Sequence, residues 1–160
     1  MQISSNPTPT AFILASALQR KIVAVALRRE GVASLQLSQT GVHLLQMCRW
    51  GKIAIPHLLI WEWQPKPISL LKAFHEVMPQ THIILYGRHQ GREGLQMALT
   101  GMLLRLQVGM SIGYLRKPFQ QKGCQALLDT LLPERRKENV DSIPCIDWKQ
   151  LSALPSRFTL

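Results

Sequence analysis

The chain has 160 residues, of which 46% are hydrophobic and 18% are charged. This length suits one domain, and so much apolar sequence excludes a wholly disordered chain. Lys and Arg number 19 against 9 Asp and Glu, so the formal net charge is +10. The imbalance reflects scarce acids more than abundant bases, because Glu30 and Glu62 are the only carboxylates before Lys72.

Five short apolar runs alternate with five stretches of helical pattern. The predicted strands cover residues 11–15, 32–37, 57–61, 82–86 and 112–115. The predicted helices cover 18–29, 40–48, 68–77, 92–107 and 122–132. Apolar runs without alternation are typical of strands that are buried on both faces of a parallel sheet. The sequence therefore predicts an α/β fold, a doubly wound parallel sheet between two layers of helices.

The pattern also predicts a buried helix face and the domain bounds. Leu18, Ile22, Val25 and Ala26 recur with helical spacing, so we expect them to face the core. Residues 1–10 read as a flexible tail and 11–133 as the domain. Residues 134–160 read as a C-terminal tail, either docked or flexible, whose charged run at 134–138 is expected to be solvated.

The three cysteines, Cys48, Cys124 and Cys145, lie far apart and form no C-x-x-C pair. Neither a zinc site nor a disulfide framework is indicated, so we expect buried thiols in a reducing cytoplasm. No apolar stretch reaches the roughly 18 residues that a membrane span needs. The sequence predicts a cytoplasmic protein with no metal, no cofactor and no membrane contact.

Two motifs carry a resemblance to a known family. The run GYLRKPF at 113–119 resembles the fifth-strand signature of response-regulator receiver domains, and PHLLIWE at 56–62 resembles their third strand. The resemblance covers 11–133 and implies a flavodoxin-like (βα)5 fold. It makes Lys117, before Pro118, the lysine that contacts the phosphoryl group, and Tyr114 the switch aromatic. Glu62 stands where the phospho-accepting aspartate falls.

The departures from that pattern are equally informative. Receivers hold Mg²⁺ with an acidic pair after the first strand, where this chain has Leu14-Ala15-Ser16-Ala17. Tyr86 replaces the family's Ser or Thr, and Glu62 carries one methylene more than Asp. Since phosphoryl transfer depends on positioning and on a metal, the sequence predicts a pseudo-receiver that is not phosphorylated.

We expect Glu62 and Lys117 to face each other at the carboxyl ends of adjacent strands. They would be either an internal ion pair that fixes one switch state or two solvated rim residues. No catalytic residue is predicted. The G-x-S-x-G spacing around Ser111 matches a hydrolase elbow, but the predicted strand follows this serine instead of preceding it.

The expected function is that of a stand-alone signalling or regulatory module. The resemblance implies that a protein partner, or a second copy, binds through the surface of the fourth helix, fifth strand and fifth helix. Two alternatives stay open. The charge of +10 allows a nucleic-acid-associated regulator, although the cations are dispersed and no binding motif accompanies them. A small-anion or nucleotide sensor would use Arg88 and Arg92, in the glycine-rich run 87–94, at the former phosphorylation pocket.

Overall fold

The computed structural model of the chain describes residues 8–37, 41–64, 68–135 and 145–147. Its strands are β1 (Thr10–Leu14), β2 (Ala33–Leu37), β3 (Leu58–Glu62), β4 (His82–Gly87), β5 (Ile112–Arg116) and β6 (Cys145–Asp147). Its helices are α1 (Ala17–Arg29), α2 (Gly41–Arg49), α3 (Ile68–Val77), α4 (Gly91–Val108) and α5 (Gln121–Leu131). The five predicted strands and five predicted helices are confirmed.

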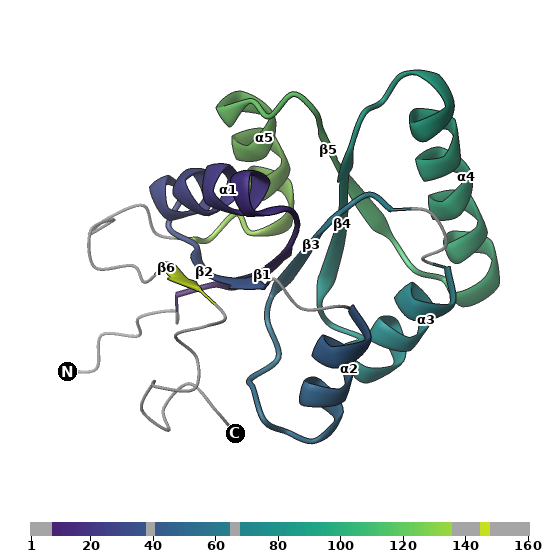
Figure 1. Cartoon of the computed structure of the whole chain (residues 1–160), viewed down its shortest axis with the longest axis horizontal. Helices are drawn as coiled ribbons and strands as arrows, with labels where there is room; N and C mark the ends of the chain where they lie inside the picture. Colours follow the sequence, from purple (N-terminus) through teal and green to yellow (C-terminus); the bar gives the residue numbers. More distant parts are fainter. Residues whose placement is uncertain (1–7, 38–40, 65–67, 136–144, 148–160) are drawn as a thin grey trace.

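All strands lie in one parallel sheet with the order β5-β4-β3-β1-β2-β6 (Figure 1). The chain moves outward in opposite directions from β1 and β3, as in other doubly wound sheets. The predicted flavodoxin-like fold is therefore confirmed. The sequence did not predict β6, a three-residue strand that pairs with β2 at the edge of the sheet.

Helices α1 and α5 cover one face of the sheet, and α2, α3 and α4 cover the other (Figure 1). Successive side chains of a strand enter opposite cores. In β1, Ala11 and Ile13 join the α1–α5 core, whereas Phe12 and Leu14 join the other. Because both faces are buried, the strands carry unbroken apolar runs.

The predicted buried face of α1 is correct for Ala26 and wrong for Leu18 and Val25. Leu18 is 66% exposed and Val25 is 51% exposed, and the residues that face the core are Val23, Ala24, Ala26 and Leu27. The helix has apolar residues on two sides, so spacing alone does not identify the side that meets the sheet. Ile22 and Val25 instead line an open groove that also contains Phe119.

Two of the three cysteines are buried, as the sequence predicted. Cys48 and Cys124 are buried thiols that form no disulfide. Burial raises the pKa of Cys48 to about 11 and, with a contribution from the Glu30 carboxylate, that of Cys124 to about 12. The side chain of Cys145 lies outside the described side chains. None of the described helices is long and apolar enough to cross a bilayer.

The sequence predicted that the charged run at 134–138 is solvated, and this is wrong for Arg135. Arg135 has a side chain only 2% exposed, and its Nη2 lies 2.7 Å from Glu30 Oε1 and 2.7 Å from Asp129 Oδ1. Glu30, at the end of α1, is 8% exposed. This buried ion pair fastens the segment after α5 to α1. Residues 136–138 lie outside the described residues.

We predict that Arg135→Ala lowers the free energy of unfolding by about 3–5 kcal/mol, because it removes one partner of a buried ion pair. Asp129→Asn is the matched control. Asp129 is 57% exposed, so its loss should cost less than about 1 kcal/mol. Urea denaturation of both variants measures the difference, and equal losses would contradict the assignment.

Candidate functional site

The residues singled out by the sequence meet at the carboxyl edge of the sheet. Glu62 ends β3, Ser16 follows β1, and Lys117 follows β5. The expectation that Glu62 and Lys117 occupy adjacent strands is wrong, because β4 lies between β3 and β5. The Lys117 side chain therefore passes over β4 to reach Glu62.

Both oxygens of the Glu62 carboxylate are hydrogen-bonded. Lys117 Nζ donates to Oε2, and the Ser16 backbone N–H donates to Oε1 at 2.7 Å. The Glu62 side chain is 13% exposed and that of Lys117 is 22% exposed. The predicted contact is thus present, and the two residues are not solvated rim residues.

The surroundings of Glu62 favour its ionised form. Burial by itself would raise the pKa of this carboxyl. The hydrogen bonds from Lys117 and Ser16, together with the positive charge of Lys117, outweigh burial and hold the pKa of Glu62 below its ordinary value. Glu62 and Lys117 therefore form an ion pair at neutral pH.

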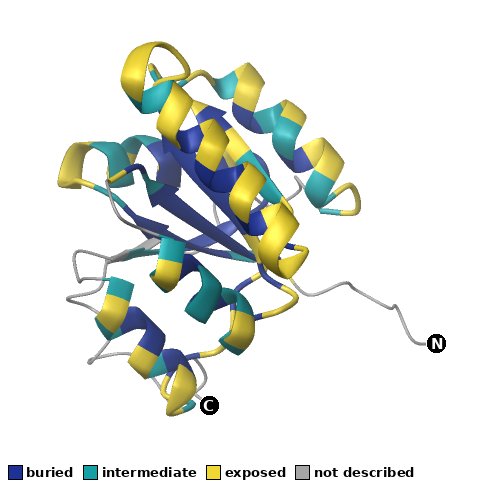
Figure 2. Ribbon diagram, turned by 90° about the vertical axis from the view of Figure 1, so that its right-hand side faces the viewer, coloured by how far each residue is buried: buried dark blue, intermediate teal, exposed yellow. Residues whose placement is uncertain are grey.

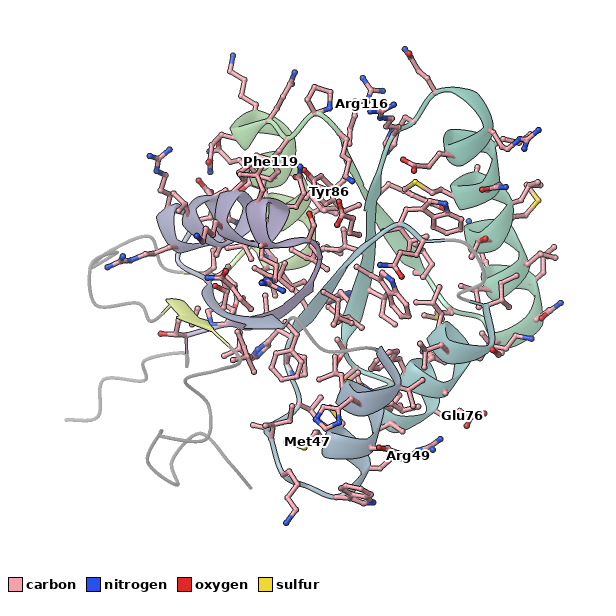
Figure 3. All side chains as sticks on the ribbon, in the orientation of Figure 1. Met47, Arg49, Glu76, Tyr86, Arg116 and Phe119 are labelled. Carbon is pink, nitrogen blue, oxygen red and sulfur yellow. The ribbon has the colours of Figure 1, made fainter. Side chains whose placement is uncertain are left out.

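The ring of Tyr86, in β4, lies next to this ion pair. This ring is fully buried and packs edge-to-face on Phe119, with centroids 6.3 Å apart (Figure 3). Its hydroxyl donates to Gln19 Oε1. Lys117 Nζ lies 5.2 Å from the ring centroid, a cation–π contact. Burial, with the nearby Glu62 charge, raises the pKa of Tyr86 to about 12. Tyr86 therefore fills space at the position where the family has a small hydroxyl residue.

The contacts made by Phe119, Ser16 and Gln19 were not predicted from the sequence. Phe119 belongs to the 113–119 motif and could have been proposed as a packing partner of Tyr86. The Ser16 N–H follows from its position after β1, because strand ends at this edge lie close together. No sequence signal indicates Gln19, whose contact with Tyr86 spans 67 positions.

The residues present do not fit the Mg²⁺ ion that receivers hold. Mg²⁺ requires carboxylate oxygens, and Ala15 and Ser16 supply none beside Glu62. Both Glu62 oxygens already accept hydrogen bonds, and the Lys117 ammonium stands at one of them. Across the described residues as a whole, no three His, Cys, Asp or Glu side chains lie close enough together to hold a metal.

Tyr114, the residue matched to the switch aromatic, connects β5 to α4. It is 37% exposed, and a Cβ placed on Gly101 of α4 would lie only 1.8 Å from its hydroxyl oxygen. Tyr114 therefore lies across α4 at a point where the helix has no side chain. The ring also meets His89 edge-on, with centroids 6.2 Å apart. Burial raises the pKa of Tyr114.

A cavity of about 450 Å³ lies beside the ion pair, between the β4–α4 and β5–α5 loops. It is lined by Arg88, His89, Gln90, Arg116, Lys117, Pro118 and Gln120. The predicted contact Arg88 is among them, and Arg92 is not. Arg116, at which β5 ends, was not predicted from the sequence to belong to the site.

Comparison with known proteins identifies the fold. No family model and no curated protein matches the sequence. Among solved structures, a response regulator from Thermotoga maritima is 15% identical with a TM-score of 0.61, covering 79% of this chain and 99% of its own. The Vibrio cholerae chemotaxis protein CheY4 is 19% identical with a TM-score of 0.57, over 78% and 98%. A putative pilus assembly-related protein from Burkholderia pseudomallei is 11% identical with a TM-score of 0.63, over 85% and 100%. The chain has the fold of response-regulator receiver domains.

We predict that Glu62→Gln and Lys117→Met are not additive. If the two side chains stabilise each other, a double-mutant cycle in urea gives a coupling of about 1–3 kcal/mol. The control cycle combines Lys117→Met with Glu76→Gln, an exposed residue of α3 at the other end of the molecule (Figure 3). That cycle should be additive within about 0.5 kcal/mol. Additivity in both cycles would contradict the pair.

The stabilisation by Glu62 should also depend on pH. Because the folded pKa of Glu62 lies below the unfolded value of about 4.3, its contribution is fully present above that pH. It is lost as the pH falls through the folded pKa. The stability difference between the native chain and Glu62→Gln should therefore shrink below about pH 4. A difference that stays constant from pH 7 to pH 3 would contradict it.

Proposed function

We propose that this chain is a cytoplasmic regulatory protein-interaction module, a receiver fold that works without phosphorylation and catalyses no reaction. The observation that carries the proposal is the saturated carboxylate of Glu62, held by Lys117 and the Ser16 N–H. Phosphorylation would require a free carboxylate oxygen and a metal beside it. The buried thiols of Cys48 and Cys124 suit a reducing compartment.

The ion pair supports a receiver held in one state. In the resembled family, the lysine and the switch aromatic respond to the phosphoryl group. Here Lys117 is already bound to a carboxylate, and Tyr114 already lies on α4 over Gly101. The α4–β5 surface is then available to a partner without a phosphorylation signal.

Helix α4 provides the interaction surface. Its inner side buries Met97, Thr100, Gly101 and Leu104 against the sheet. Its outer side carries large apolar residues that are 48% to 76% exposed, namely Leu95, Leu99, Met102 and Leu106. Figure 2 views the molecule from this side and shows exposed residues along the helix. A helix that is apolar on opposite sides is typical of one that is covered on both.

The spacing of these four residues favours a second copy of this chain as the occupant. Leu95, Leu99, Met102 and Leu106 are separated by four, three and four positions, which is the seam of a coiled coil. The seam is symmetric about the level of residues 100 and 101. An antiparallel pair of α4 helices would therefore place Leu95 against Leu106 of the second copy, and Leu99 against Met102.

Charge selects the antiparallel arrangement. Arg92 lies seven positions before Leu99, on the same seam. A parallel pair would bring the Arg92 side chains of the two copies together, and like charges repel. In the antiparallel pair, the Arg92 side chains of the two copies lie at opposite ends of the helix–helix interface. The resulting two-fold interface is self-complementary, as in most soluble homodimers.

Phosphorylation tests the proposed function directly. We predict that the chain gains no phosphoryl group from acetyl phosphate with Mg²⁺, because Glu62 is engaged and has no acidic neighbour. Intact-mass spectrometry measures the uptake, and a response regulator with the complete acidic set is the positive control. Uptake that Glu62→Gln abolishes would overturn the proposal.

Self-association tests the surface. We predict that Met102→Glu weakens the dimer by about tenfold or more, because the seam would bury a carboxylate without a partner. Leu18→Glu is the matched control, since Leu18 is 66% exposed, against 59% for Met102, but lies on α1. Sedimentation equilibrium measures both. A native chain that is monomeric at high concentration would contradict the pairing and leave the phosphorylation result unaffected.

Disulfide trapping tests the direction of the pair. In a Cys145→Ser background, a mixture of Leu99→Cys and Met102→Cys chains should cross-link on mild oxidation, because the antiparallel register places these positions opposite each other. Each variant alone should cross-link much less. Cross-linking of Leu99→Cys with itself would instead indicate a parallel pair.

A further inference from the structure

We propose that the cavity between the β4–α4 and β5–α5 loops binds a small molecule that carries a phosphate group. The cavity measures about 450 Å³, within the range of small-ligand sites. This site is separate from the α4 surface and goes beyond the proposed function, so each can fail without the other.

The charge of the lining favours an anion. The lining includes three cations, Arg88, Arg116 and Lys117, and no carboxylate. Glu62 neutralises Lys117. Neither Arg88 nor Arg116 has an acidic side chain within salt-bridge distance in the described part of the chain. Two uncompensated guanidinium groups therefore face one cavity, and guanidinium binds phosphate through paired hydrogen bonds.

The donors around the cavity remain available. Within the described residues, the Arg116 guanidinium has one partner, the His89 ring, whose Nδ1 lies 3.5 Å from Arg116 Nε. This contact orients the guanidinium and leaves its terminal nitrogens for a ligand. The side-chain amides of Gln90 and Gln120 also line the cavity and can donate to a phosphate oxygen or to the remainder of a ligand.

The backbone around the cavity is fixed in place. The Arg88 N–H donates to Glu93 Oε2 at 2.6 Å, and the Lys117 N–H donates to the Gly87 carbonyl oxygen at 2.9 Å. A Cβ on Gly94 would lie 2.3 Å from the His89 backbone, so the loop approaches α4 as closely as a glycine allows. A site held in this way loses little conformational freedom when a ligand binds.

Phosphate is a better fit than a carboxylate ligand or nucleic acid. A phosphate group offers several oxygens to two guanidinium groups at once, whereas a carboxylate offers two. Nucleic acid requires an extended basic surface, and the cations outside this cavity are dispersed along the chain. The cavity selects a small phosphate-bearing molecule, either inorganic phosphate or an organic phosphate of nucleotide size.

Isothermal titration calorimetry of the full chain tests the site with four probes: inorganic phosphate, pyrophosphate, ADP and adenosine. We expect the phosphate-bearing probes to bind and adenosine to bind at least tenfold more weakly. Tighter binding of ADP than of pyrophosphate assigns the site to an organic phosphate, and the reverse assigns it to an inorganic one. Absence of heat with every phosphate probe, or equal affinity for adenosine and ADP, overturns the proposal.

Variants that each remove one positive charge distinguish binding in the cavity from nonspecific attraction of anions to a cationic protein. Arg88→Gln and Arg116→Gln should each weaken binding by about tenfold, as expected for a lost hydrogen bond to a charged group. Arg49→Gln removes the same charge from the opposite end of the molecule (Figure 3). It should change affinity by roughly twofold at most, because distant exposed charges are screened. Equal losses in all three variants would overturn the site, and thermal melting confirms that each variant is folded.

Discussion

The interaction on which the rest of the site depends is the ion pair between Glu62 and Lys117. Together with the Ser16 N–H, it joins the ends of β1, β3 and β5 at one point of the sheet. Either side chain alone would be a half-buried charge without compensation, which is costly. The pair therefore has to form as a unit. It occupies the position where the resembled family carries out phosphoryl transfer.

The pair also determines its surroundings. Because the Lys117 side chain crosses β4, the residue below it has to tolerate an ammonium group, and the ring of Tyr86 does so through a cation–π contact. The ring in turn packs on Phe119, and its hydroxyl contacts Gln19. A small hydroxyl residue in place of Tyr86 would leave this space empty.

Prediction from the sequence succeeded for features that depend on the local pattern of apolar residues. The buried strands follow from apolar runs, and the Glu62–Lys117 contact follows from strand ends that share one edge. Prediction failed where the outcome depends on distant residues. The partner of Arg135 lies 105 positions away, and α1 has apolar residues on two sides. Helix α4 also carries apolar residues on opposite sides, and only one of these sides meets the sheet.

The scarcity of acids, rather than the number of bases, explains how charge is distributed. Four of the described carboxylates make specific contacts: Glu30 and Asp129 with Arg135, Glu62 with Lys117, and Glu93 with the Arg88 backbone. Each commitment serves the fold, so few acids remain to neutralise other cations. Most of the other described cations are exposed and screened, and attract anions only weakly. Arg88 and Arg116 differ because they border one cavity on a fixed backbone. The net charge of +10 thus becomes specific recognition only where the fold brings two guanidinium groups together.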